Sequence, residues 1–504
     1  MNTYKQIKQL VILFIVMLII RLAVALLMGP GADEAYYYVY SLHPDTSYFD
    51  HPPFVALLGG LIPGITGIVS PLTLRLLPII LFSIAVYIFF LTAKLLLKKS
   101  EAVMAVSLFM VVPMFFLSGT MLLPDAGLIF FWVLGLYLTL KTLEAPTHLN
   151  WIILGVVAGF GMLSKYTAAF LFISGFIFII LDKDHRKLFL TPGPYLALLA
   201  AVITFSPVLA WNYSHGFVSF LFQGKRVGMG GIKLRYFYQS FFGQMGYILP
   251  FVFIPCIYYG IKSVILIFKN NSRYERFLFC YGALPVTVFM AASLFKRVLP
   301  HWPVIGYISL TLAAGKFYES LKEKKKPLFN LYAIGHSFIV ILLITAALLQ
   351  IYTGIIFNRE LPESGIEKKS PVKDISIDII GWNFLEKHLK EAGYRESDIF
   401  LFTHKWYVGG QIAFAVRGRY PVMCLSSIGD ARGFSIWQDQ EKEIGKDGLF
   451  ICTSKFFLDP SQRYSGYFDS IELAETIPVM RNKKLVKNIY VYKCRNFRKP
   501  YPVN

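Results

Sequence analysis

The chain has 504 residues, of which 56% are hydrophobic and 16% aromatic, and its mean hydropathy is +0.55. This composition is unusual for a soluble domain and predicts a membrane protein. The formal net charge of +20 could suit a nucleic-acid binder, but no motif that reads a nucleic-acid groove accompanies it. Loop charges that set topology and attract anionic lipid explain the charge, and nucleic acid is not an expected partner.

Apolar runs long enough to cross a bilayer recur along the first 351 residues, and we count about eleven of them. The first run is too long for a signal peptide and no small-residue cleavage site follows it, so we expect a retained anchor. The segment 55–69 is apolar but contains glycines and Pro63, which favours a partly inserted or interfacial helix. The runs lie at 7–28, 72–97, 101–119, 122–141, 150–164, 166–181, 188–211, 241–268, 276–294, 302–318 and 328–351.

Lysine and arginine recur at alternate loops between these runs, beginning with Lys5 and Lys8 before the first. The positive-inside rule then predicts a cytoplasmic N-terminus and outward-facing loops at 29–71, 119–125, 212–240 and 295–301, with everything after about 352 also outside. One outward loop is itself basic and contains Lys225 and Arg226. It is either a solvated surface or a contact with a phosphate or an anionic glycolipid headgroup.

The composition changes after residue 357, where a polar, Pro-containing linker begins. We therefore divide the chain into a membrane domain, 1–357, and a small extracytoplasmic α/β domain, 358–504. The second domain shows no nucleophile elbow, phosphate loop or metal cluster, which favours a role in packing, as a lid or in positioning the acceptor. The five cysteines have no metal-binding spacing. Predicted strands lie at 399–403, 420–425, 448–453 and 488–494, and helical segments at 380–392 and 435–444.

The most informative stretch follows the first apolar run and reads GADEAYYYVYSLHPDTSYFDHPPF, residues 31–54. It places Asp33, Glu34, Asp50 and His51 at a membrane boundary among tyrosines. Carboxylates and imidazoles at such a boundary are costly unless they are solvated or used. The stretch therefore predicts a polar site for a reactant that is itself partly lipid.

Asp33-Glu34-Ala35 followed by Tyr48-Phe49-Asp50-His51-Pro52-Pro53 resembles the bacterial branch of the protein O-mannosyltransferase superfamily. That branch includes the aminoarabinose and galacturonic acid transferases that modify lipopolysaccharide. The resemblance implies a polytopic α-helical membrane protein of the GT-C type and a polyprenyl-phosphate-linked sugar as donor. Further similar segments are Leu123-Pro124-Asp125, Gly161-Met162-Leu163-Ser164-Lys165-Tyr166-Thr167, Trp211-Asn212 and Leu299-Pro300-His301-Trp302-Pro303.

The resemblance implies that Asp33 is the catalytic base, because the family places its catalytic carboxylate there. Alternatively Glu34 is the base and Asp33 a structural hydrogen-bond acceptor. Asp50 would orient substrate and His51 would face the lipid phosphate. The aminoarabinose transferases carry Glu-Lys-Pro-Pro here, and a histidine is only partly charged near pH 7. In the structural alternative, Asp50 and His51 pair with each other and cap the interfacial helix.

Four further residues each have a functional and a structural interpretation. Asp125 lies near the family's active site, or complements the dipole at the start of its helix. Lys165 binds donor phosphate or snorkels to the membrane surface. Arg297 and His301 have the same two interpretations as Lys165, and contact with the donor phosphate is favoured because the outer loops converge in this fold.

These residues predict an inverting glycosyltransferase that moves a sugar from a polyprenyl-phosphate donor to lipid A, another glycolipid or an envelope glycan. Such a reaction needs a base and groups that hold the departing phosphate, and no cofactor. A divalent metal is possible if Asp33, Asp50, His51 and His301 converge. The alternative is a carrier or flippase for lipid-linked sugars, which should instead place polar residues at mid-membrane. The expected location is a bacterial inner membrane.

Overall fold

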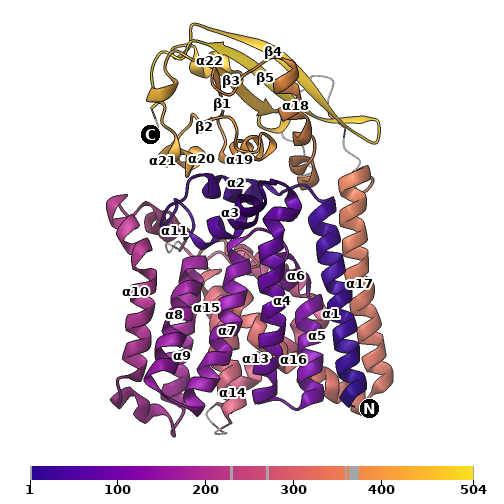
Figure 1. Cartoon of the computed structure of the whole chain (residues 1–504). Helices are drawn as coiled ribbons and strands as arrows, with labels where there is room; N and C mark the ends of the chain where they lie inside the picture. Colours follow the sequence, from indigo (N-terminus) through magenta and orange to yellow (C-terminus); the bar gives the residue numbers. More distant parts are fainter. Residues whose placement is uncertain are drawn as a thin grey trace. The chain divides into compact units, whose positions relative to one another are not determined.

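The computed structural model describes residues 3–227, 231–267, 269, 272–357, 360–361 and 374–502. Figure 1 shows these residues as α-helices with one five-stranded sheet near the C-terminus. The chain divides into two compact units. The helical unit comprises Met1–Ala25, His51–Leu58 and Arg75–Ile341, and the mixed unit comprises Leu26–Asp50, Gly59–Leu74 and Leu342–Asn504.

The described part of the chain up to Thr353 consists mainly of α-helices, and short 3-10 or π-helical segments lie between some of them. They are α1 (Thr3–Leu27), α2 (Ala32–Leu42), α3 (Phe54–Thr66), α4 (Pro71–Leu96), α5 (Lys99–Val111), α6 (Pro113–Ser118), α7 (Pro124–Glu144), α8 (His148–Ser164), α9 (Phe170–Leu181), α10 (Gly193–Ser214), α11 (Val218–Val227), α12 (Leu234–Ile248), α13 (Pro250–Leu266), α14 (Arg273–Leu278), α15 (Leu284–Ala292), α16 (Val304–Lys324) and α17 (Lys326–Thr353).

Among the described residues, six helices are long and apolar enough to cross a membrane, or up to seven if the bent pair α12 and α13 is one span. This supports a multi-pass membrane protein, but the predicted count of about eleven is not confirmed. Several predicted runs form shorter or broken helices. The run 101–119 breaks before Pro113, because a proline disfavours helical backbone in the residue that precedes it. α8 ends at Ser164, as the predicted run does, but at 17 residues it is shorter than the six long apolar helices.

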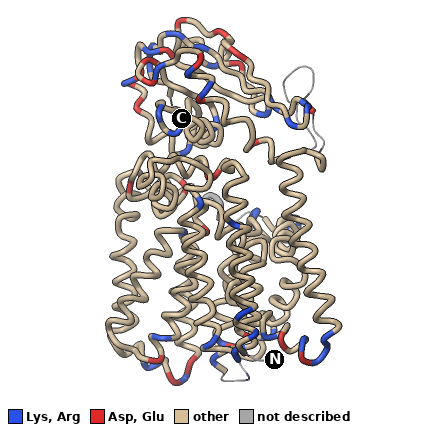
Figure 2. Tube along the Cα trace, turned by 45° about the vertical axis from the view of Figure 1, so that its right-hand side comes forward, with Lys and Arg blue, Asp and Glu red and all other residues tan. Residues whose placement is uncertain are grey.

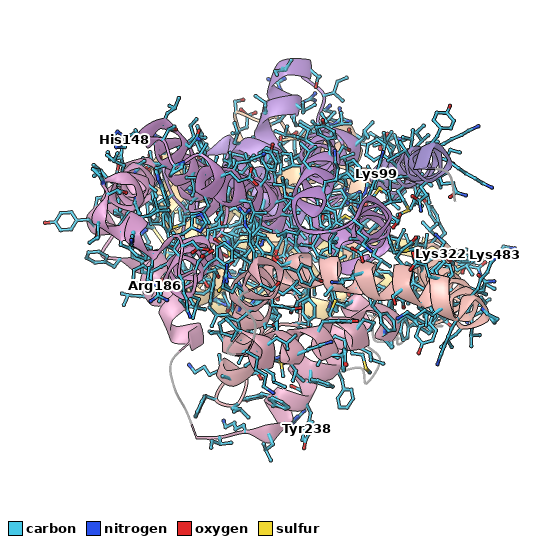
Figure 3. All side chains as sticks on the ribbon, turned by 90° about the horizontal axis from the view of Figure 1, so that it is seen from below. Lys99, His148, Arg186, Tyr238, Lys322 and Lys483 are labelled. Carbon is cyan, nitrogen blue, oxygen red and sulfur yellow. The ribbon has the colours of Figure 1, made fainter. Side chains whose placement is uncertain are left out.

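Charged residues of the helical unit gather at the end of its bundle that carries the N-terminus, and the middle of the bundle has few (Figure 2). Figure 3 shows the bundle from below, with Lys99, His148, Arg186 and Lys322 spread around it. Each of these residues lies near the beginning or end of a helix or in a short connecting segment. The apolar middle is what burial in a bilayer requires.

The sheet of the mixed unit has the strand order β2-β1-β3-β5-β4. β1 (Ile399–Thr403) pairs in parallel with β2 (Val422–Cys424) and with β3 (Asp447–Thr453), whereas β5 (Lys484–Arg495) is antiparallel to β3 and to β4 (Ser470–Arg481). β4 and β5 form a hairpin whose two-residue turn, Asn482 and Lys483, has positive φ at both positions, as a type I′ turn requires. The mixed unit also contains α18 (Leu385–Glu391), α19 (Trp406–Ala415), α20 (Ile428–Ala431), α21 (Phe434–Trp437) and α22 (Pro460–Tyr464).

All four predicted strands occur in the structure, but β4 was not predicted. β4 is an edge strand and most of its side chains are at least partly exposed, so it lacks the apolar signal that marks a buried strand. The segment 435–444 is helical only in part, over α21 and a short 3-10 turn.

Within the mixed unit, α19 packs closely against α2, the helix that carries the acidic pair of the first loop. A Cβ added at Gly410 of α19 would lie 2.8 Å from the backbone nitrogen of Tyr36. The next residue, Gln411, donates from Nε2 to the carbonyl oxygen of Pro30 at 2.9 Å. A glycine at this point of α19 therefore permits backbone contact, and the C-terminal segment helps to fix the start of α2.

Candidate functional site

The structure distinguishes the two neighbouring carboxylates at the start of α2. Glu34 is buried, and its Oε2 accepts a hydrogen bond of 2.9 Å from the backbone N–H of Gly31. This satisfies one of the backbone groups left over at a helix terminus. Asp33 is exposed and lines a pocket of the mixed unit. The geometry therefore favours Asp33 over Glu34 as the group that can reach a substrate.

Asp50 is almost completely buried at the end of the first loop, and it is held by two side chains of the mixed unit. The hydroxyl of Tyr40, on α2, donates to its Oδ1. Burial raises the pKa of Tyr40 well above its usual value, and the nearby Asp50 charge adds to this effect. Tyr40 therefore remains a neutral donor at physiological pH.

The second partner of Asp50 is Arg432, whose Nη1 lies 2.8 Å from Oδ2. The Arg432 guanidinium also stacks over the ring of Trp406, with its central carbon 3.9 Å from the ring centroid. This arrangement combines an ion pair with a cation–π contact. A charged group from the last hundred residues thus completes the environment of the first-loop aspartate.

Arg432 was not identified from the sequence as a site residue. In the structure its backbone conformation is unusual. Its φ is +49° and its ψ is −126°, a conformation that favours glycine. The backbone N–H of the next residue, Gly433, donates to the hydroxyl of Tyr36 at 2.9 Å. An arginine in a strained turn, aimed at a buried carboxylate, is a pattern that clusters at functional sites. The local sequence contains no motif that would reveal it.

A second polar cluster lies within the helical unit and is centred on Asp125, the second residue of α7. Both of its carboxylate oxygens lie 2.9 Å from Nζ of Lys165, the residue at the C-cap of α8. The side chains are 6% and 12% exposed, so this is a buried ion pair. His51 and His301 lie close enough to interact electrostatically with Asp125. The structure therefore gathers four of the predicted site residues.

Helix packing explains how the chain forms this cluster. A Cβ added at Gly127 of α7 would lie 2.5 Å from Oγ of Ser164 and 2.6 Å from the ring of Phe54. The glycine therefore lets α7 approach both the end of α8 and the beginning of α3. These two segments are next to Lys165 and His51 in the sequence, so the close approach brings both side chains toward Asp125.

The environment of the cluster also revises two of the predicted roles. Lys165 is buried against Asp125 rather than snorkelling to a surface, and Asp125 uses both oxygens on this partner rather than only complementing its helix. Burial lowers the pKa of His301 to about 4, with Lys165 acting in the same direction and Asp125 against it. His301 is therefore neutral near pH 7 and offers a hydrogen bond rather than a charge.

Three other predicted substrate-binding residues do not join this cluster in the described contacts. Arg297 is exposed in the irregular segment before α16. The side chains of Lys225 and Arg226, in α11, lie outside the described residues. Among the residues described, no three His, Cys, Asp or Glu side chains gather as a metal ion would require.

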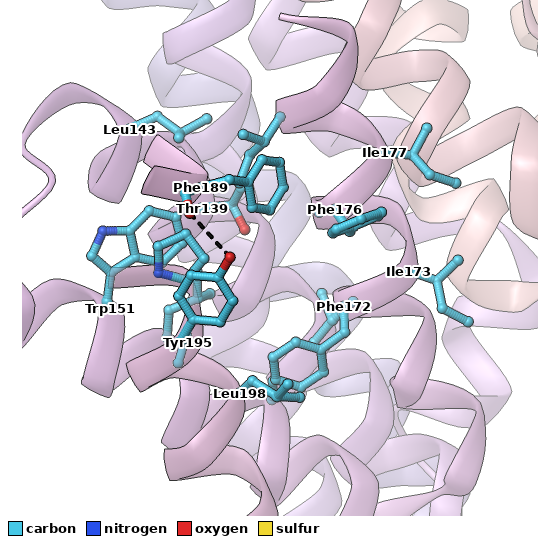
Figure 4. Close-up of a pocket in the computed structure, with 17 residues that line it drawn as sticks. Thr139, Leu143, Trp151, Phe172, Ile173, Phe176, Ile177, Phe189, Tyr195 and Leu198 are labelled. Atoms are coloured by element: carbon cyan, nitrogen blue, oxygen red, sulfur yellow. Dashed lines mark hydrogen bonds between the residues drawn. The ribbon is translucent and has the colours of Figure 1, made fainter. Parts of the chain in front are cut away.

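A further cavity of the helical unit, about 600 Å³ in volume, lies between α7, α8, α9 and α10 (Figure 4). Its wall consists mainly of aliphatic and aromatic side chains, including Trp151, Phe172 and Phe176. The Tyr195 hydroxyl donates to the carbonyl oxygen of Phe189 at 3.0 Å. The lining is suited to apolar contact and contains no carboxylate or amine, so we assign no chemistry to it.

A known protein family matches the part of the chain that contains several of these residues. The sequence model of the dolichyl-phosphate-mannose-protein mannosyltransferase family matches residues 50–211. This range includes Asp50, His51, Asp125 and Lys165. It begins after Asp33 and Glu34.

Two similar sequences come from Rhizobium johnstonii (strain DSM 114642 / LMG 32736 / 3841). Lipid A galacturonosyltransferase RgtD is 21% identical over 285 residues, which cover 56% of this chain and 59% of RgtD. Lipopolysaccharide core galacturonosyltransferase RgtA is 26% identical over 182 residues, 36% of each chain. The chain thus matches less than two thirds of the length of either relative.

Among solved structures, ArnT from Cupriavidus metallidurans matches nearly the whole chain. The apo structure has a TM-score of 0.60 at 13% identity and covers 95% of this chain and 97% of ArnT. The structure bound to undecaprenyl phosphate has a TM-score of 0.61, also at 13% identity, and covers 96% and 97%. The chain resembles GT-C glycosyltransferases. At this identity the structural match establishes the fold, and the resemblance inferred from the first loop is confirmed.

Proposed function

We propose that the protein is an inverting glycosyltransferase that moves a sugar from a polyprenyl-phosphate donor to a hydroxyl of lipid A, another glycolipid or an envelope glycan. The observation that carries this proposal is that the two carboxylates at the start of α2 have different environments. Glu34 caps its own helix, while Asp33 is exposed on a pocket wall. The GT-C fold and the glycosyltransferase relatives supply the reaction class.

In this reaction Asp33 acts as general base. It takes the proton of the acceptor hydroxyl while that oxygen attacks the anomeric carbon of the donor sugar. The bond between this carbon and the phosphate oxygen breaks, and polyprenyl phosphate leaves with the electron pair. Attack from the face opposite the phosphate inverts the anomeric carbon. A phosphate is already a good leaving group, so the scheme uses no cofactor of its own.

The buried cluster of the helical unit would serve the departing phosphate. Lys165 supplies a positive charge, and the two bonds from its ammonium to Asp125 fix its position. Preorganised donors of this kind stabilise charge that develops in a transition state. His301 would donate a hydrogen bond from its neutral ring, and His51 would face the same phosphate. Asp50, held by Tyr40 and Arg432, would orient substrate rather than accept its proton.

The proposed location is a bacterial inner membrane, with the N-terminus in the cytoplasm and the C-terminal domain outside. The basic end of the helix bundle, which carries the N-terminus, supports this orientation (Figure 2). Membrane lipids, a polyprenyl-phosphate sugar and a glycolipid acceptor are the proposed partners.

The decisive experiment is sugar transfer by the purified protein in liposomes. It offers a panel of polyprenyl-phosphate sugars with a native lipid extract as acceptor, and compares wild type with Asp33→Asn and Glu34→Gln. We expect Asp33→Asn to reduce the rate by about 10²–10⁴-fold, the usual contribution of a general base. Glu34→Gln should keep most activity, since it alters a helix cap worth about 1 kcal/mol.

Three results would contradict this assignment. Loss of activity in Glu34→Gln but not in Asp33→Asn would move the base to Glu34. Full activity in both variants would remove the base from this helix. If wild type consumes no donor, while a labelled lipid-linked sugar crosses between leaflets, the protein is a carrier.

A further inference from the structure

Asp33 lies on the wall of a pocket formed entirely by residues of the mixed unit. The pocket has a volume of about 370 Å³, within the range of about 300–1,000 Å³ that is typical of small-molecule sites. Most of its wall comes from the C-terminal part of the chain. We call it the Asp33 pocket, and its lining includes Asp33, Asp378, Trp382, Trp406, Tyr407 and Lys487.

Aromatic rings form a large part of this wall. Tyr407 lies with its ring centroid 5.1 Å from that of Trp406 and 4.7 Å from that of Phe456, which also lines the pocket. Trp and Tyr present an apolar face together with a polar edge. A sugar ring has the same two characters, because its C–H groups form apolar patches and its hydroxyls lie around the rim.

Two charged groups of the wall, Asp378 and Lys487, already have polar partners within the protein. Lys455 Nζ lies 2.6 Å from Oδ2 of Asp378. Lys487 is buried and donates to the carbonyl oxygens of Ile377, at 2.9 Å, and of Ile380. Burial lowers the pKa of Lys487 to about 7, so part of its population is uncharged at neutral pH. A wall with two carboxylates and a single lysine, which is held by backbone carbonyls, is poorly suited to hold a phosphate.

We propose that the Asp33 pocket binds the sugar ring of the acceptor and presents its hydroxyl to Asp33. This inference rests on the proposed function, since the acceptor is the substrate that a general base must touch. Donor recognition, by contrast, requires cations for a phosphate, and the cluster around Lys165 in the helical unit provides one. The C-terminal segment therefore selects the acceptor, and its sequence determines which glycolipid is modified.

The packing of α19 on α2 gives this inference a structural basis. α19 supplies Trp406 and Tyr407 to the pocket, and the same helix contacts the backbone of α2 at Gly410 and Pro30 at Gln411. The aromatic wall and the carboxylate are thus held by one helix pair. An acceptor that fits against these rings would be positioned relative to the base.

The test measures the KM for acceptor and for donor separately, using the full chain in liposomes with the transfer assay described above. We compare wild type, Tyr407→Ala and a matched control, Tyr467→Ala, in which a tyrosine of the same unit outside the pocket is truncated. Tyr407→Ala should raise the KM for the acceptor roughly tenfold, equivalent to about 1.4 kcal/mol. Its KM for the donor should stay within about twofold of wild type, and Tyr467→Ala should change neither.

A second measurement does not depend on transfer. Saturation-transfer NMR with the purified full chain reports direct contact with methyl pyranosides of glucosamine, galacturonic acid and glucose. We expect a signal from at least one of them with wild type and with Tyr467→Ala, and a weaker signal with Tyr407→Ala.

The outcomes separate this inference from the proposed function. If Tyr407→Ala is folded and transfers sugar with an unchanged KM for the acceptor, the pocket assignment is wrong and the glycosyltransferase stands. A rise confined to the KM for the donor would also overturn it, because the pocket would then hold the donor sugar. If wild type transfers no sugar from any donor, the proposed function fails, and the pyranoside measurement alone decides whether the pocket binds sugars.

Discussion

Each unit of the molecule buries an aspartate against a basic side chain, and the two pairs look alike at first. Asp125 and Lys165 meet at 2.9 Å in the helical unit, and Asp50 and Arg432 meet at 2.8 Å in the mixed unit. Both carboxylates are almost completely buried. The pairs differ in where their cations come from.

The helical pair joins residues 40 positions apart on neighbouring helices, whereas the mixed pair joins residues 382 positions apart. Asp125 and Lys165 both lie at helix ends within recognisable segments, so the sequence could nominate each of them. Arg432 lies in a strained turn of the C-terminal fold. Asp50 in the first loop therefore depends on Arg432 of the C-terminal domain for its charged partner. From the sequence alone, that domain is expected to serve in packing, as a lid or in positioning the acceptor.

The largest effect of a substitution is expected at the pair formed by Asp125 and Lys165. Asp125→Asn would leave the Lys165 ammonium buried without its counter-charge, which typically costs about 3–5 kcal/mol. We expect a clear fall in the free energy of unfolding, measured in detergent by thermal or denaturant unfolding, and a loss of transfer activity. Lys165→Met removes the other partner and should destabilise the protein to a similar degree.

The double variant Asp125→Asn with Lys165→Met serves as the control for this prediction. If the two residues stabilise each other, it should be more stable than the sum of the single losses indicates. Strictly additive losses would show that the pair contributes no coupling.

A substitution at Arg432 tests how the second pair differs from the first. Arg432→Lys keeps the charge but loses the planar group that stacks on Trp406, so it should not restore the arginine contact. We expect a smaller loss of stability than at the helical pair, because Arg432 is 19% exposed. Transfer activity should still decrease, since Asp50 loses a defined partner.

The matched comparison is Lys165→Arg in the helical unit, and both variants are measured by transfer kinetics and thermal unfolding. Full activity in Arg432→Lys would show that charge alone holds Asp50. That result would remove the proposed role of the stacking contact.

The smallest expected effect concerns pH. The pKa of His301 is lowered to about 4 in the folded protein, below the usual value of 6.5. The unfolded chain therefore binds a proton between pH 6.5 and 4 that the folded chain does not, and the free energy of unfolding falls as the pH falls through this window. His301→Asn should lose less stability than wild type between pH 7 and 4.5, as measured by thermal unfolding. Identical slopes would show that His301 titrates normally.

The sequence predicts much of the helical part, because apolar runs and helix-end signals are local. The segment predicted as an interfacial helix, for example, corresponds closely to α3. The count of spans is not confirmed, since Pro113 divides the run 101–119, and the runs 150–164 and 166–181 form helices shorter than the six long apolar ones. Local signals also identify β1 and β3 but not the edge strand β4.

Some residues of the candidate site could likewise be predicted from local sequence, and others could not. Asp33, Asp50, Asp125 and Lys165 belong to segments that resemble known motifs, so the sequence could nominate them. The choice between Asp33 and Glu34 required the hydrogen bond to Gly31, which only the structure provides. Arg432 and the aromatic wall around Tyr407 depend on tertiary contacts between distant segments, and no periodicity or motif signals them.

The backbone of Arg432 has a consequence for how this protein can be improved or impaired. A glycine would adopt φ +49° without strain, but it would take the Arg432 charge away from the buried Asp50 carboxylate. The strain of the turn is therefore offset by the contacts of a fixed charge beside Asp50. Attempts to stabilise the protein by relieving backbone strain should therefore leave this turn unchanged, because they would also remove a charged partner of a buried carboxylate.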